Sequence, residues 1–111
     1  MDLRWSTKSE VLRKMTESLA HRGPDGRGEY WAPKETCGVQ LGLGHRRLAV
    51  LDLTEAGHQP MQSASERYVI TFNGEIYNHL EIRDQIDSSS GGHHWRGTSD
   101  TETLLAAIEL W

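Results

Sequence analysis

The sequence has 111 residues, of which 36% are hydrophobic and 25% are charged, and its formal net charge is −4. Such a chain has the size of one domain and the composition of a globular protein, and its scattered Lys and Arg residues exclude the basic stripe of a nucleic-acid-binding protein. No apolar run approaches the roughly 20 residues of a membrane span, and the first residues lack the apolar core of a signal peptide.

A helix is predicted first, over residues 8–20. Its apolar positions recur on one helical face, namely Val11, Leu12, Met15 and Leu19. Thr7 and Glu10 have the spacing of a capping box, and Gly23 is a natural helix stop. The tripeptide Pro24-Asp25-Gly26 then predicts a turn.

Strands are predicted next. Residues 39–53 indicate one or two strands, in which Gly42 and Gly44 allow the close approach of another part of the chain. The apolar positions of this stretch are Val39, Leu41, Leu43, Leu48, Val50 and Leu51. Residues 67–72, RYVITF, are apolar on both faces, so we expect this strand to be covered on both sides.

Two helices complete the pattern. Asn78 is placed to cap a helix over 79–87, with Glu81 completing the capping box. Ser99 and Glu102 have the same spacing at the start of a helix over 99–111. The residues expected to be buried on these helices are Leu80, Ile82, Ile86, Leu104, Leu105, Ile108 and Trp111. The order of helix, strands, helix and helix indicates an α+β fold.

The first candidate site is the Asn73-Gly74 pair in FNGEIYN. Taken alone, such a pair is most often the turn of a two-residue hairpin. Here, however, it leads from an expected buried strand into an Asn-capped helix rather than into a second strand. The Asn side-chain amide and the Gly N–H can then donate two hydrogen bonds to one oxygen, which is the arrangement of an oxyanion hole.

Charged residues give two further candidates. Asp100, in the first turn of a helix, compensates the helix dipole or binds the ammonium group of a substrate. Arg46 and Arg47 are either a solvated surface pair or, in a strand, point to opposite sides, so one is expected to face inward. An inward Arg needs an anionic partner, and a carboxylate bound through two hydrogen bonds fits best.

Metal and thiol chemistry have little support. His93 and His94 lie in a Ser/Gly loop with no second group of ligands, so no metal site is expected. Cys37 has no His at a fixed spacing and is expected to be an ordinary semi-buried thiol rather than a nucleophile. As the sole cysteine it excludes an internal disulfide, which suits a reducing, cytoplasmic setting.

Five motifs, HRGPDG, LGHRRLAVLDL, GHQPM, FNGEIYN and SDTE, occur in this order. Together they resemble the glutamine amidotransferase domain of asparagine synthetases, a class II amidotransferase and N-terminal-nucleophile hydrolase. The resemblance covers nearly all of residues 8–111. It implies a four-layer αββα sandwich, of which this chain would hold about half, so residues 1–111 are expected to be a partial amidotransferase domain.

The resemblance also implies roles for the candidate residues. The Asn73 side chain and the Gly74 N–H would form the oxyanion hole, and Arg47 would bind the α-carboxylate of glutamine. Asp100, with Glu75 nearby, would hold its α-ammonium group. In the family an N-terminal Cys attacks the glutamine amide with its own α-amine as base, and ammonia passes to a synthetase domain that uses ATP and Mg.

The sequence departs from the family at its start. Members begin with Met-Cys-Gly and an apolar strand, whereas residue 2 here is Asp. Cys37 cannot replace the missing nucleophile, because its backbone nitrogen is an amide and not a base. The sequence also ends inside an apolar helical pattern, at LLAAIELW, so both ends are expected to be truncated.

Three interpretations therefore remain open. The first is a truncated, inactive part of an asparagine synthetase that binds glutamine and lacks the C-terminal synthetase domain as its partner. The second is a relative without the nucleophile, whose domain is a scaffold. The third is a non-catalytic module that binds an amino acid or a protein partner. Whether the chain forms a homo-oligomer stays open in all three.

Overall fold

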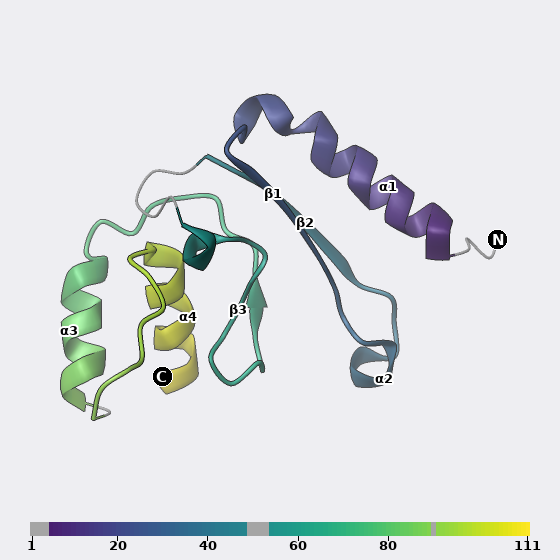
Figure 1. The fold of residues 1–111 in the computed structure, drawn as a ribbon. Coiled ribbons are helices and arrows are strands. Elements are labelled where there is room, and N and C mark those ends of the chain that lie inside the picture. The colour runs from purple at the N-terminus through teal and green to yellow at the C-terminus, as the bar shows by residue number, and fades with distance from the viewer. Residues whose placement is uncertain (1–4, 49–53, 90) are drawn as a thin grey trace.

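The computed structural model describes residues 5–48, 54–89 and 91–111. Within these ranges the chain is a mixture of helices and short strands, which confirms the α+β class (Figure 1). The helices are α1 (Trp5–Ser18), α2 (Lys34–Cys37), α3 (His79–Ser89) and α4 (Asp100–Leu110), with 3₁₀ turns at Ala20–Arg22 and Glu55–Gly57. The strands are β1 (Gly26–Trp31), β2 (Gly42–Arg47), β3 (Met61–Gln62) and β4 (Val69–Ile70).

One part of the fold is an antiparallel ribbon with a helix on one face. β1 and β2 pair from Gly26 opposite Arg47 to Trp31 opposite Gly42, and α1 runs along this ribbon (Figure 1). The close approach predicted at Gly44 is confirmed, because a Cβ atom there would overlap Oγ1 of Thr16 on α1. Thr16 is buried at this contact, with 3% of its surface exposed.

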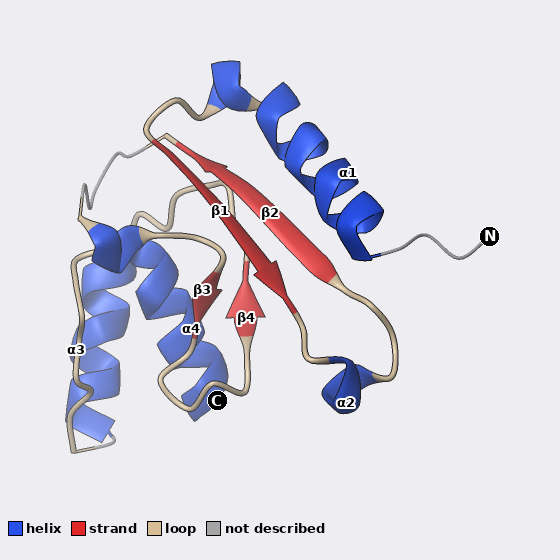
Figure 2. Cartoon of the chain, turned by 45° about the vertical axis from the view of Figure 1, so that its right-hand side comes forward, coloured by secondary structure: helices blue, strands red, loops and turns tan. Residues whose placement is uncertain are grey.

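The other part holds the small apolar core. α3 and α4 pack side by side next to the β3–β4 hairpin, in which Met61 pairs with Ile70 (Figure 2). The buried hydrophobic residues among those described are Met61, Ile86, Leu105 and Ala106. All four belong to this second part, so it, and not the ribbon, contains the core that supports the start of α4.

The described chain is elongated. Its Cα radius of gyration is 15.6 Å, whereas a compact domain of this length has a value of about 13 Å. Apolar side chains stay open to solvent along α1 and just after β2, with Val11 47%, Met15 61% and Leu48 61% exposed. The apolar face that the sequence pattern indicates on the first helix is therefore largely open to solvent.

Several boundaries differ from the sequence-based predictions. The first helix begins at Trp5, so Thr7 lies inside it and the predicted capping box is wrong. A strand at Gly26–Trp31 was not predicted, because its four polar or glycine positions hide the alternation. Val50 and Leu51 lie outside the described residues.

The strand predicted over 67–72 is reduced to Val69–Ile70. Both residues are only half-buried, and Tyr68 is 36% exposed, so the prediction that this strand is covered on both sides is wrong. The apolar pattern alone could not reveal that this strand has only β3 beside it.

The last two helices agree better with the sequence. Their positions are confirmed, as is the burial of Ile86 and Leu105, although Leu80, Ile108 and Trp111 are exposed. No helix in the described part of the chain combines the length and apolar character needed to cross a membrane.

Replacing Gly44 with Ala should destabilise the chain by about 1–3 kcal/mol, because the added methyl group must displace Thr16 and lift α1 from β2. Gly26→Ala is the matched control, since a Cβ atom there meets Arg47 Cβ at an ordinary 3.5 Å. Urea unfolding of both variants and the parent chain measures the difference. Equal stability of the two variants would contradict the close packing of α1 on β2.

Candidate functional site

One small cavity collects residues from four separate segments of the chain. Its volume is about 70 Å³, and it lies where the end of β2, the 57–59 segment, the 72–75 segment and the start of α4 meet. All five residues singled out from the sequence line it, namely Arg47, Asn73, Gly74, Glu75 and Asp100. Residues up to 53 positions apart in the sequence are thus neighbours in space.

Asp100 ties the start of α4 to the segment that follows Asn73-Gly74. It is 7% exposed, and its Oδ2 accepts a hydrogen bond of 2.8 Å from the backbone N–H of Ile76. Its place in the first turn of α4 also sets its negative charge against the positive end of the helix dipole. The carboxylate is therefore held at a defined place on the wall of the cavity.

Ser99 and Arg83 fix the beginning of α4. The predicted cap is confirmed, because Ser99 Oγ accepts a hydrogen bond of 3.1 Å from Thr101 N–H. Arg83, on α3, donates to the Gly97 and Ser99 carbonyls at 2.8 and 2.9 Å, and its guanidinium lies 4.1 Å from the centre of the Trp95 ring. Arg83 could not be identified from the sequence, since an Arg on an amphipathic helix gives no sign of its partners.

The tandem arginines end β2 and have different partners. Arg47 Nη1 donates to the Thr54 carbonyl at 2.8 Å, and Arg46 Nε donates to the Gly23 carbonyl at 2.9 Å. Both residues belong to the lining of the cavity, and their guanidinium groups bind carbonyls of two different segments. The positive charges of these two lining residues favour an anionic group in the cavity.

Asn73-Gly74 is not a hairpin turn. The chain runs from β4 to α3 through residues 71–78, all described, without a second strand. A Cβ atom at Gly74 would come within 2.8 Å of the Phe72 ring, so glycine lets this ring pack closely against the backbone here. Asn73 also lines a neighbouring cavity of about 200 Å³, which shares His45 and Arg46 with the first.

Gln59 is a second residue that the sequence analysis did not identify as part of the site. It is 8% exposed, and its Oε1 accepts a hydrogen bond of 2.6 Å from Phe72 N–H. Its Nε2 donates to Thr101 Oγ1 at 3.2 Å. The only signal in the sequence is its place in the GHQPM motif, which the pattern analysis treats as a loop.

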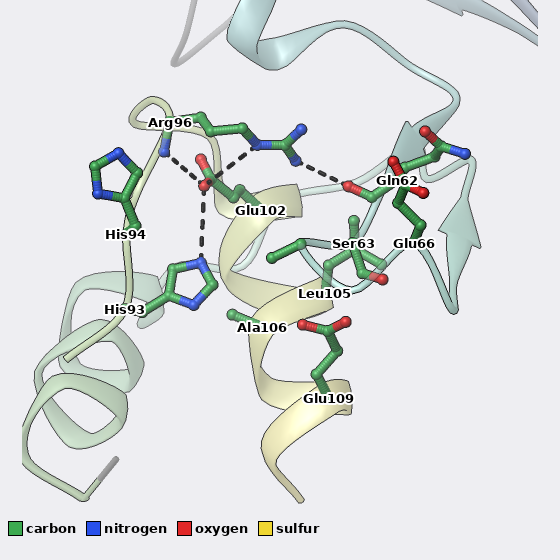
Figure 3. Close-up of a pocket in the computed structure, with 11 residues that line it drawn as sticks. Gln62, Ser63, Glu66, His93, His94, Arg96, Glu102, Leu105, Ala106 and Glu109 are labelled. Carbon is green, nitrogen blue, oxygen red and sulfur yellow. Dashed lines mark hydrogen bonds and ion pairs between the residues drawn. The ribbon is translucent and has the colours of Figure 1, made fainter. Parts of the chain in front are cut away.

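A larger cavity of about 310 Å³ lies on another flank of α4 (Figure 3). Glu102 points toward it but is occupied by the protein, because it accepts hydrogen bonds from the N–H groups of Arg96 and Gly97 at 2.7 and 3.0 Å. Arg96 Nε and His93 Nε2 also lie 3.8 and 4.0 Å from its carboxylate. Glu102 therefore anchors the loop before α4 and does not complete the predicted capping box with Ser99.

The family of the chain follows from its match to a known domain. A family model described as a glutamine amidotransferase domain matches residues 2–111. The chain belongs to the glutamine amidotransferase domain family.

The relatives of this amidotransferase chain are named as asparagine synthetases or as an amidase. It is 38% identical over 99 residues to "Asparagine synthetase [glutamine-hydrolyzing] 1" of Bacillus subtilis, which covers 89% of the chain and 14% of the relative. It is 36% identical to "Asparagine synthetase [glutamine-hydrolyzing] 3" of the same organism, over 94% of the chain and 16% of the relative. "Amidase chyE" of Penicillium rubens is 36% identical over 87% of the chain and 13% of its own length. The amidotransferase chain thus spans less than a fifth of the length of these relatives.

The position of Cys37 separates it from the cavity. Its backbone ends α2, at the end of the β1–β2 ribbon away from Arg47 (Figure 1), while its side chain lies outside the described part of the structure. β2 alone, six residues long, puts about 17 Å between its two ends. Among the residues that the structure describes, no group of three or more His, Cys, Asp or Glu side chains is gathered as metal ligands would be.

His45 supplies a neutral group at the wall shared by the two cavities of the amidotransferase chain. It is 9% exposed, and its Nδ1 lies 2.8 Å from Thr71 Oγ1. Burial lowers the pKa of His45 below its usual 6.5, and the nearby charges of His58 and Arg47 lower it further. The imidazole is therefore neutral at pH 7, which avoids a third positive charge beside Arg46 and Arg47.

This pKa shift predicts a pH dependence of stability. Because the pKa is lower in the folded chain, the unfolded chain binds the proton more tightly, so the free energy of unfolding should fall as the pH drops below 6.5. His45→Gln should remove this part of the pH dependence, and urea unfolding between pH 8 and about pH 5 measures it for both chains. The lowered pKa of Glu109, caused mainly by the Ser65 hydroxyl, is common to both chains and cancels in the comparison. Parallel stability curves for the two chains would contradict the burial of a neutral His45.

Proposed function

We propose that the chain is the glutamine-binding part of the amidotransferase domain of an asparagine synthetase. In the complete enzyme this domain would hydrolyse glutamine and supply ammonia for the ATP-dependent conversion of aspartate to asparagine. The observation that carries the proposal is the meeting of Arg47, Asn73, Gly74, Glu75 and Asp100 at one cavity. The names of the relatives from Bacillus subtilis support the same reaction.

The charges on the cavity wall suit an amino acid. Arg47 would bind the α-carboxylate of glutamine, for which a guanidinium is the best partner in proteins. Asp100 and Glu75 would bind the α-ammonium group. The Asn73 side chain and the Gly74 N–H would donate to the carboxamide oxygen, where negative charge develops during attack on the amide.

Hydrolysis needs a nucleophile that the chain does not bring to this cavity. An amide is attacked by a thiolate or by a thiol with an adjacent base, and the backbone of Cys37 lies at the other end of β2. We propose that the complete enzyme supplies an N-terminal Cys, whose α-amine serves as base. The chain by itself would then bind glutamine without cleaving it.

The remaining features of the proposal come from the family resemblance. The αββα sandwich would be completed by parts of the domain beyond this chain, which would cover the exposed apolar side chains of α1. By the same resemblance, ATP and Mg would be bound by the synthetase domain. The complete enzyme would act in the cytoplasm.

A second candidate is a domain that binds glutamine but has no hydrolytic role in the complete protein. The absence of a thiol among the residues that line the cavity favours it. The two candidates share the binding step and differ in hydrolysis by the complete protein, so binding and ammonia release are tested separately.

Arg47→Met and Asp100→Asn should each weaken L-glutamine binding by about 10- to 100-fold, since each removes a charged hydrogen bond to the ligand. Asn can still accept the hydrogen bond from Ile76 N–H, so Asp100→Asn should preserve the local structure. Arg67→Met is the matched control, because Arg67 is exposed and stacks on Tyr68. Titration followed by NMR measures the affinities, and an equal loss in all three variants would contradict the assignment of the cavity.

The purified chain should release no ammonia from glutamine above the rate of a buffer blank, because an oxyanion hole and binding groups give little catalysis when the nucleophile is missing. Cys37→Ala is the comparison variant. Turnover by the parent chain that disappears in Cys37→Ala would show that Cys37 is a nucleophile and would overturn this account.

A further inference from the structure

We propose that Gln59 is a positioning residue that sets the distance between the two ends of the glutamine site. The role of Gln59 in glutamine binding rests on the proposed function, whereas its two hydrogen bonds are made within the chain and need no ligand. Gln59 lies between the residue before Asn73 and the residue after Asp100. Its single side-chain amide bonds both of them, at Phe72 N–H and at Thr101 Oγ1.

The orientation of this amide is determined by its partners. The N–H of Phe72 is only a donor, so the oxygen of the Gln59 amide must face it, and the NH₂ group is left to face Thr101. Gln59 and Thr101 are 8% and 3% exposed, so each of these polar groups is buried and depends on its partner. A flipped amide would set two donors against each other at Phe72 and lose the hydrogen bond.

The backbone of Gln59 is also fixed. A Cβ atom at Gly28 of β1 would overlap the Gln59 carbonyl oxygen, so β1 packs directly against this residue. The side chain therefore projects from a fixed base and has little freedom to follow movements of either partner. It acts as a spacer of constant length between the 72–75 segment and α4.

Together with Asp100, this spacer holds the 73–75 segment at both ends. Phe72, on one side, is linked through Gln59 to Thr101, and Ile76, on the other side, donates directly to Asp100. Both links end in the first turn of α4. The groups proposed to bind the carboxamide of glutamine are thereby placed at a set distance from the carboxylate proposed to bind its ammonium group.

The geometry makes a specific prediction for Gln59→Met and Thr101→Val. Each change removes the link on the Phe72 side and leaves the Ile76–Asp100 link. Binding of the amino acid head group should persist, whereas the additional affinity contributed by the carboxamide should be lost. L-norvaline has the same backbone groups as glutamine but no carboxamide, so the ratio of the two affinities isolates this contribution.

The experiment has a first measurement that needs no ligand. Hydrogen exchange followed by NMR should show the Phe72 amide exchanging at least about 10-fold faster in both variants, while the Ile76 amide keeps its parent rate. The effect of Thr101→Val is decisive, because Thr101 reaches Phe72 only through Gln59. Gln85→Met, the same chemical change on the exposed surface of α3, should leave both rates unchanged. An unchanged exchange rate of the Phe72 amide in Thr101→Val would overturn the proposal. Because Val has nearly the same shape as Thr, this variant leaves no cavity that could itself alter the exchange rate.

The second measurement compares ligands. In the parent chain L-glutamine should bind at least about 10-fold more tightly than L-norvaline, and in both variants this ratio should fall toward one while norvaline affinity stays the same. A general loss of structure would instead weaken both ligands together, and either that result or an unchanged ratio would overturn the positioning role. If the parent chain binds neither ligand, the proposed function fails for this chain, while Phe72 exchange still decides whether Gln59 forms the link.

Discussion

The hydrogen bond from the Ile76 amide to the Asp100 carboxylate is the contact on which the site depends. It joins the segment after Asn73-Gly74 to the first turn of α4, and further contacts fix the position of Asp100. Ser99 caps the helix that carries Asp100, and Arg83 holds the chain that leads into it. A buried carboxylate needs such donors, so the geometry of the 73–76 segment follows from the placement of α4.

The site is positioned by the better-packed part of the molecule. The buried residues Ile86 and Leu105 lie on α3 and α4, while α1 and the residues that flank β2 leave apolar side chains exposed. Arg47 is the one predicted ligand group that the ribbon supplies, at the end of β2 that lines the cavity together with the start of α4. The ribbon therefore contributes the cationic side of the cavity, and the α3–α4 part contributes the acidic and amide side.

Local signals in the sequence predicted the features that depend on local chemistry. Ser99 as a helix cap, the two last helices and the close approach at Gly44 all follow from residue type and spacing. The links made by Gln59 and Arg83 could not be predicted, because each joins residues that only the fold brings together. The strand at Gly26–Trp31 was missed for a related reason, since its pairing with β2, and not its own pattern, makes it a strand.

The orientation of bound glutamine tests the central claim most directly. Intermolecular nuclear Overhauser effects between labelled chain and L-glutamine should place the glutamine side-chain amide next to Asn73 and Gly74, and its α-proton on the side of Arg47 and Asp100. The reversed orientation would contradict the roles assigned to these residues. Contacts with Arg96 and Glu109 instead would place the ligand in the cavity of Figure 3 and contradict the choice of site.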